Sequence, residues 1–391
     1  MRFLQTVARL LKAVTATAVT ASVIANDTRR VMYLTGQHNV IPSRDLANPI
    51  THVILAFLRS EVFAADGPPA EYPLFTTVDI VRDGFELGTK VTIAIGGWGD
   101  WEGFQAAAKT PESRKKWSEQ VGIMVNATGA DGIDIDWEYP GGNRDDYKQI
   151  PNSKREWEIE AFVELLQELR AVLGKDKLLT VATPGKEVDL IAFTPSTIPR
   201  IVKAVDFINV MSYDLMNRRD TTIQHHSGVD ASKEAVQRYI DRGAPATQLN
   251  VGLGYYVKWY LTEDGCDPKK PVGCPTQLLE DPETGADLGR VGGFSWHDET
   301  PPELVGSFAR ARAHGIYDKD GSYGYWDKEE LRWWSFDTPE VIGTKMEKLV
   351  GNMKLGGVFA WGLGEDAPEF AHLGATIKGL GQKDCHSKDE L

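Results

Sequence analysis

Eight short apolar runs recur along the chain, and segments with helical spacing lie between them. After the fourth run, for example, Phe162, Leu165, Leu166, Leu169 and Val172 recur at helical intervals, with Glu, Gln and Arg between them. Strands that alternate with helices form a parallel sheet, which is either closed into a (β/α)8 barrel or left open. The pattern alone does not decide between these two α/β architectures. The runs cover residues 31–35, 51–58, 90–97, 132–138, 178–183, 205–213, 250–255 and 356–361.

The fourth run carries an acidic residue at every second position. Because side chains alternate between the two faces of a strand, Asp134, Asp136 and Glu138 should share one face, with neighbours in this row about 6.6 Å apart. The residues between them are Ile and Trp, so we expect a buried strand rather than a solvated edge strand. Carboxyl groups that share a poorly solvated site repel one another, so at least one should have a raised pKa. A carboxylic acid that stays protonated near neutral pH is a candidate general acid.

The segment around these acids, D-G-I-D-I-D-W-E-Y-P, resembles the signature of glycoside hydrolase family 18, the chitinases and their relatives. In the family's order, residues 92–98 resemble its third-strand motif, residues 209–214 its sixth-strand M-x-Y-D motif, and residues 357–361 its eighth strand. The resemblance extends from about residue 30 to about residue 380. It implies the closed (β/α)8 barrel rather than the open sheet.

The seventh and eighth runs are separated by about 100 residues, where one helix would suffice. This stretch resembles the small α+β insertion that deepens the cleft in many members of the family, and we place it at about residues 256–340 of a catalytic barrel that covers 26–381. Cys266 and Cys274 bracket a segment rich in Pro, Gly and Lys, and we expect them to form a disulfide. Cys385 is then left over.

The resemblance implies a role for each acid in a retaining, substrate-assisted cleavage, in which the sugar's own 2-acetamido oxygen attacks the anomeric carbon. Glu138 would protonate the leaving oxygen and then activate water. Asp136 would hold the acetamide N–H and share a proton with Asp134, and Tyr213 would donate its hydroxyl to the acetamide oxygen. The substrate contacts implied in the same way are Tyr33, Phe57, Gly97, Trp98, Tyr139, Met211, Asp214 and Trp361.

Two positions depart from the family pattern. Ala94 stands where the third-strand motif has Ser, whose hydroxyl would bond the inner aspartates. Its loss should raise the proton affinity of Asp134 and Asp136 and shift the pH optimum. Lys258 stands where many relatives have Arg at the start of the insertion. The compact ammonium of Lys cannot form the bidentate contacts of the planar Arg guanidinium, so sugar binding should be altered.

The function that we expect is hydrolysis of β-1,4 linkages in chitin or chitooligosaccharides. Two alternatives stay open, an endo-β-N-acetylglucosaminidase that cuts N-glycans and a chitin lectin without activity, although the lectins typically lack the acid at position 138. Endo or exo action and processivity are left undecided. The net charge of −13 disfavours nucleic acid and anionic membranes as partners. We expect no cofactor and no metal, because His225-His226 lacks a spaced third ligand and is interpreted as a polar loop.

The two ends of the chain carry targeting signals. Residues 1–25 are predicted to be a secretory signal peptide, with a mitochondrial presequence as the alternative. Lys388-Asp389-Glu390-Leu391 is the retrieval signal of the endoplasmic reticulum, so we expect a luminal protein that meets the KDEL receptor, with secretion as the alternative. Asn26 and Asn126 begin glycosylation sequons. No other stretch reaches 18 apolar residues, so we expect a mature chain without a membrane span, and a monomer.

Overall fold

The computed structural model describes residues 28–64 and 67–381. The predictions for the signal peptide, Asn26, Cys385 and the last four residues therefore lie outside the described residues. Among the helices that are described, none combines the length and the apolar character needed to cross a bilayer.

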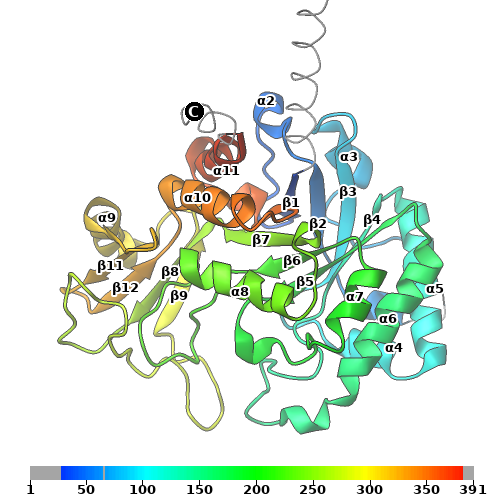
Figure 1. Ribbon diagram of the computed structural model, residues 1–391, viewed down its shortest axis with the longest axis horizontal. Helices are drawn as coiled ribbons and strands as arrows, with labels where there is room; N and C mark the ends of the chain where they lie inside the picture. Colours follow the sequence, from blue (N-terminus) through cyan, green and yellow to red (C-terminus); the bar gives the residue numbers. More distant parts are fainter. Residues whose placement is uncertain (1–27, 65–66, 382–391) are drawn as a thin grey trace, which may run out of the picture.

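Eight parallel strands close into a barrel in the order β1-β13-β7-β6-β5-β4-β3-β2, with β2 pairing back onto β1 (Figure 1). The closed (β/α)8 barrel is thus confirmed. The strands are β1 (Arg29–Thr35), β2 (His52–Leu58), β3 (Lys90–Gly96), β4 (Gly132–Asp136), β5 (Leu178–Pro184), β6 (Phe207–Met211), β7 (Leu249–Gly254) and β13 (Gly357–Trp361).

Helices cover the outside of the barrel, and the outward side chains of the strands pack against them. On β4, Ile133 and Ile135 point outward, and Trp137 just beyond them stacks on Phe104 with 5.3 Å between the ring centroids. The two helix starts that carry Thr-Pro are capped by the threonine hydroxyl, Thr110 for α5 and Thr338 for α10. The helices are α2 (Arg44–Ala47), α3 (Val78–Asp83), α4 (Glu102–Ala108), α5 (Pro111–Thr128), α6 (Trp157–Leu173), α7 (Ile198–Ala204), α8 (Val229–Asp241), α10 (Pro339–Lys345) and α11 (Ala371–Gly381).

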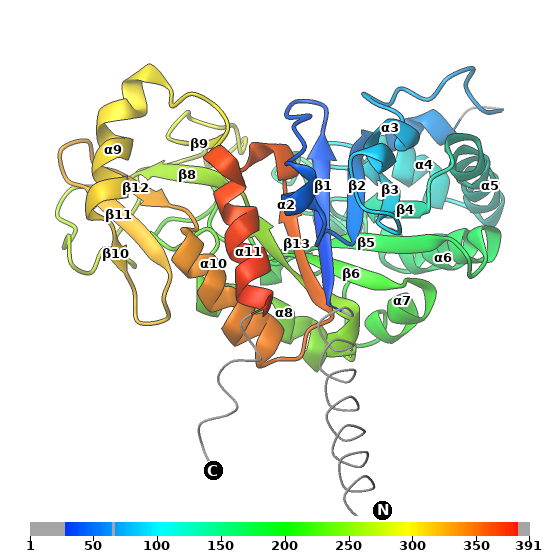
Figure 2. The ribbon, with the colours of Figure 1, turned by 90° about the horizontal axis from the view of Figure 1, so that it is seen from above.

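The long stretch between β7 and β13 forms a second, five-stranded antiparallel sheet in the order β10-β11-β12-β8-β9. It lies on one side of the barrel, away from α4, α5 and α6 (Figure 2). A disulfide joins Cys266 to Cys274 in the connection between β8 and β9. The elements are β8 (Tyr256–Leu261), β9 (Val291–Ser295), α9 (Val305–His314), β10 (Ile316–Tyr317), β11 (Tyr323–Asp327) and β12 (Arg332–Ser335).

Two strands end two residues earlier at their carboxyl ends than the sequence pattern predicts. The fourth run was expected to reach residue 138, but β4 ends at Asp136, whose carbonyl accepts a hydrogen bond from the Gly97 amide (N···O 2.9 Å). The sixth run was expected to reach residue 213, but β6 ends at Met211. In both cases the acidic or aromatic residues beyond the last rung of the ladder lie in the loops at the barrel mouth, where reactive groups of such barrels are found.

Candidate functional site at the barrel mouth

A cleft of about 1000 Å³ opens at the carboxyl ends of the barrel strands, between the barrel loops and strands β8 and β9 of the second sheet. Asp134 lies beneath its floor and is fully buried. Every other site residue expected from the sequence lines this cleft: Tyr33, Phe57, Gly97, Trp98, Asp136, Glu138, Tyr139, Met211, Tyr213, Asp214 and Trp361.

Asp134 is held inside the barrel by three side chains from other strands. Its Oδ2 accepts from the Tyr33 hydroxyl at 2.6 Å, and its Oδ1 accepts from the Thr180 hydroxyl at 2.5 Å and from the Asn209 amide at 3.4 Å. Burial raises the pKa of Asp134 to about 6, although these hydrogen bonds oppose the rise. The Asp134 carboxyl therefore keeps its proton to a higher pH than an exposed aspartic acid does.

Asp136 lies one pleat closer to the mouth on the same inward face. Burial, followed by the charges of Glu138 and then Asp134, holds the pKa of Asp136 well above its usual value. Its Oδ1 is buried and has no hydrogen-bond partner among the residues that the structure describes. A buried acceptor without a partner is costly, so this oxygen is suited to an N–H donor supplied by a ligand.

Glu138 follows β4 and is half-buried at the cleft. Burial raises its pKa to about 7; the Tyr139 hydroxyl opposes the rise, and the charges of Asp214 and Asp189 add to it. Sequence reasoning attributed such a rise to repulsion among the three acids, but burial is its largest cause here. At neutral pH a substantial fraction of Glu138 is protonated and able to donate a proton.

Tyr213 and Asp214 lie just beyond β6, after Ser212. Burial and the nearby carboxylates keep the pKa of Tyr213 well above its usual value, so its hydroxyl remains a donor. Burial opposes ionisation of Asp214, but the Lys258 ammonium, 3.2 Å from its Oδ1, is the strongest of the neighbours that favour it, and the pKa of Asp214 lies below its usual value. Lys258, which departs from the Arg of many relatives, therefore forms an ion pair with Asp214 in the cleft.

Aromatic rings form the floor of the cleft. Trp361, at the end of β13, stacks on Phe57 with 5.5 Å between the ring centroids and 23° between the planes, and it also contacts Tyr33. Gly97 lies against this stack with φ of 92°, and a Cβ there would come within 2.7 Å of the Phe57 ring. The position therefore requires glycine for both conformation and space. Trp98 stands at the rim with 53% of its surface exposed.

Three residues that complete the site were not singled out from the sequence. Thr180 and Asn209 bond Asp134 from β5 and β6, and the signal for both is a polar residue on the inward face of a buried strand. His226 was expected to lie in a polar loop. The segment is a loop, but His226 is fully buried and lies against Asp214.

Comparison with known proteins gives a consistent result. The model of glycosyl hydrolases family 18 matches residues 29–366. Chitinase 1 of Aphanocladium album is 27% identical, in an alignment that covers 88% of this chain and 83% of that protein. Probable chitinase 10 of Drosophila melanogaster is 25% identical over 81% of this chain, which spans 14% of that longer protein.

A solved structure agrees on the fold. The chitinase RmChi1 of Rhizomucor miehei superposes with a TM-score of 0.72 at 20% identity, covering 90% of this chain and 100% of the other. The family match covers most of the chain, and the acids of the signature lie together at the mouth of a closed barrel. The chain therefore belongs to glycosyl hydrolases family 18.

Proposed function

We propose that this protein hydrolyses β-1,4 linkages between N-acetylglucosamine units of chitin or chitooligosaccharides, with retention of configuration. The observation that carries the proposal is the placement of Glu138, with a pKa of about 7, at the cleft above Asp136, whose Oδ1 has no hydrogen-bond partner within residues 28–64 and 67–381. A protonated acid and a free acceptor for an amide N–H are what a substrate-assisted cleavage needs.

In the first step, the carbonyl oxygen of the substrate's own 2-acetamido group attacks the anomeric carbon. The bond between that carbon and the glycosidic oxygen breaks, and Glu138 gives its proton to the departing oxygen. In the second step, the Glu138 carboxylate takes a proton from water, whose oxygen adds to the anomeric carbon and opens the oxazolinium ring. Two displacements on the same carbon give net retention.

Asp136, Asp134 and Tyr213 act on the acetamido group. Asp136 Oδ1 accepts the acetamide N–H, which aims the carbonyl oxygen at the anomeric carbon, and its negative charge stabilises the cationic ring. Asp134 lies beneath it and shares its proton, because two buried neighbouring carboxyls do not readily both ionise. Tyr213 donates to the acetamide oxygen, and Trp361 supplies an apolar face for the sugar ring.

A substrate panel tests this reaction. Chitooligosaccharide should be cleaved with the β-anomer as the first product, because the second displacement reverses the inversion that the first one causes. The fully N-deacetylated oligomer, which lacks the attacking oxygen, should be cleaved at least about 10³-fold more slowly. Proton NMR of early products and chromatography measure both. Faster release from a high-mannose glycopeptide would replace the proposal with endo-β-N-acetylglucosaminidase activity, and equal cleavage of the deacetylated oligomer would exclude substrate assistance.

Restoring the hydroxyl that the family has at position 94 should move one limb of the pH profile. Ala94 pairs with Asp134 across β3 and β4, so Ala94→Ser adds a donor beside the inner carboxyls. A donor favours the ionised form and lowers the shared pKa, by about 0.7 unit for a bond of about 1 kcal/mol. Because the pair must carry negative charge, the acid limb of kcat/KM should shift to lower pH, while the alkaline limb, set by Glu138 near pH 7, should stay. Kinetics from about pH 4 to about pH 9 measure both limbs.

The matched control is Ala56→Ser, the same change in the same apolar cluster inside the barrel, on a strand that does not pair with β4. It should leave the acid limb in place. If both variants shift that limb equally, the effect does not come from a hydrogen bond to the inner carboxyls.

A further inference from the structure

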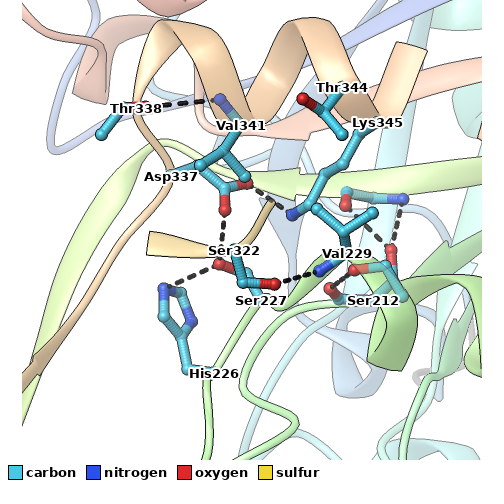
Figure 3. Close-up of polar contacts among 12 residues, drawn as sticks. Ser212, His226, Ser227, Val229, Ser322, Asp337, Thr338, Val341, Thr344 and Lys345 are labelled. Atoms are coloured by element: carbon cyan, nitrogen blue, oxygen red, sulfur yellow. Dashed lines mark hydrogen bonds and ion pairs between the residues drawn. The ribbon is translucent and has the colours of Figure 1, made fainter. Parts of the chain in front are cut away.

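A chain of buried polar groups runs from helix α10, outside the barrel, to His226 (Figure 3). His226 in turn lies against Asp214 at the cleft. Lys345 Nζ donates to Asp337 Oδ2 at 2.6 Å, and the Ser227 hydroxyl donates to Asp337 Oδ1 at 2.9 Å. The Ser227 oxygen lies 3.2 Å from His226 Nε2. All four residues are at most 2% exposed.

The hydrogen bonds between these groups all run in one direction, and this direction determines which ring nitrogen of His226 carries the proton. Because the Ser227 hydroxyl gives its hydrogen to the Asp337 carboxylate, its oxygen is left to accept from His226 Nε2–H. His226 Nδ1 then carries the lone pair. That nitrogen faces Asp214, whose backbone N–H donates to it at 3.4 Å and whose Oδ1 is 3.7 Å away.

The imidazole is held on every side. The His226 backbone N–H donates to Ser335 Oγ at 3.0 Å, and its carbonyl accepts from the Leu215 amide at 2.8 Å, so hydrogen bonds hold the backbone of the residue on both sides. The Tyr256 ring lies 5.3 Å from the imidazole. The charged groups that face the ring are Asp214 beyond β6, Lys258 on β8, and Asp337 beyond β12 with its partner Lys345 on α10.

Asp214 needs such a support. Its φ is 51°, in the left-handed region that non-glycine residues seldom occupy. The hydrogen bond from its N–H to His226 Nδ1 favours that conformation, and the conformation sets where its carboxylate lies in the cleft. The charge of Asp214 in turn contributes to the raised pKa of Glu138. A buried ion pair such as that of Lys345 and Asp337 is weak evidence of a purely stabilising role, because desolvation offsets most of its attraction.

We propose that His226 is a positioning residue for Asp214, and that Ser227, Asp337 and Lys345 fix its tautomer for that task. The inference rests on the proposed function only in that Asp214 acts beside Glu138 during glycoside cleavage. The four side chains of His226, Ser227, Asp337 and Lys345 do not line the cleft, and no proton needs to leave them.

Two isosteric variants separate the two sides of the imidazole. In His226→Asn the amide oxygen takes the place of Nδ1 and can still accept from the Asp214 amide, whereas in His226→Gln the amide nitrogen takes the place of Nε2 and can still donate to Ser227. We expect His226→Gln to lower kcat on chitooligosaccharide about tenfold, with KM within about twofold, and His226→Asn to lower it less. An equal fall of kcat in both variants, or a rise of KM with kcat unchanged, would overturn the proposal.

Ser227→Ala tests whether the Ser227 hydroxyl orients His226. It should lower kcat about fivefold in the native background and add nothing in the His226→Asn background, because the group that Ser227 orients is then absent. The matched control is Ser322→Ala, a neighbouring buried serine whose hydroxyl accepts from the Val229 amide and lies outside the chain (Figure 3). If both alanine variants lower thermal stability alike and neither changes kcat, the serine is only structural and the proposal fails.

A third measurement does not depend on activity. With ¹⁵N-labelled histidine, the His226 signals, assigned by their loss in His226→Asn, should report a neutral ring protonated on Nε2. In Ser227→Ala the proton should move to Nδ1, which lies 3.7 Å from the acceptor Asp214 Oδ1. A ring protonated on Nδ1 in the native protein, or no change in the variant, would refute the inference. If the native protein cleaves no N-acetylglucosamine oligosaccharide, the proposed function fails while the tautomer result still stands.

Discussion

Replacing Glu138 by Gln is expected to lower kcat/KM on chitooligosaccharide by about 10²- to 10⁴-fold. The amide keeps the shape of the side chain and its place at the cleft, but it has no proton to give to the leaving oxygen and cannot take one from water. KM should change far less, because the ring contacts at Trp361 and Tyr213 stay. Initial rates with a defined oligosaccharide, together with binding of the same oligosaccharide to the variant, measure the two effects separately.

Glu365 provides the matched control for this experiment. It also lines the cleft, and burial raises its pKa to about 7, as for Glu138. It follows β13 rather than β4, however, and lies near His38 instead of Asp136. Glu365→Gln should therefore change kcat/KM less than about tenfold. If Glu365→Gln abolished hydrolysis and Glu138→Gln did not, the general acid would have been assigned to the wrong end of the cleft.

The sequence was sufficient to predict those features that follow from local alternation. Asp134 and Asp136 face the barrel interior, while Ile133 and Ile135 pack outward, as the period of two requires. The barrel itself was ambiguous from the strand pattern, because closure depends on the pairing of β1 with β13, which no local signal reports. The resemblance to the family was needed to choose it.

The residues that sequence reasoning missed are those whose role depends on register between distant strands. Asp134 lies opposite Thr180 in the pairing of β4 with β5, and Asn209 reaches it from β6. Similarly, His226 was interpreted as part of a polar loop, but Ser335 of the second sheet lies against its backbone and the residue is buried. A hydrophobic pattern does not encode either contact, because each partner lies on a different element of the chain.

Glu158 on α6 is predicted to have the largest effect on stability. Its side chain is fully buried and pairs with the buried Arg144, and its carboxylate also accepts from Gln105 Nε2 at 2.6 Å and from the Gly141 amide at 2.9 Å. Glu158→Gln should lower the free energy of unfolding by about 3–5 kcal/mol, because the Arg144 guanidinium is left buried without its counter-charge. Chemical denaturation followed by tryptophan fluorescence measures the change.

Glu160, two residues along the same helix, is the control, because its pair with Arg200 is largely exposed, with 58% and 38% of the two side chains accessible. Glu160→Gln should cost less than about 1 kcal/mol. Gly141 lies three residues after Glu138, so the loosened turn in Glu158→Gln should also reduce activity at temperatures where the protein stays folded. Combining Glu158→Leu with Arg144→Met, which removes both charges, should recover part of the lost stability. Equal destabilisation by Glu158→Gln and Glu160→Gln would mean that the buried pair does not hold the turn that follows Glu138.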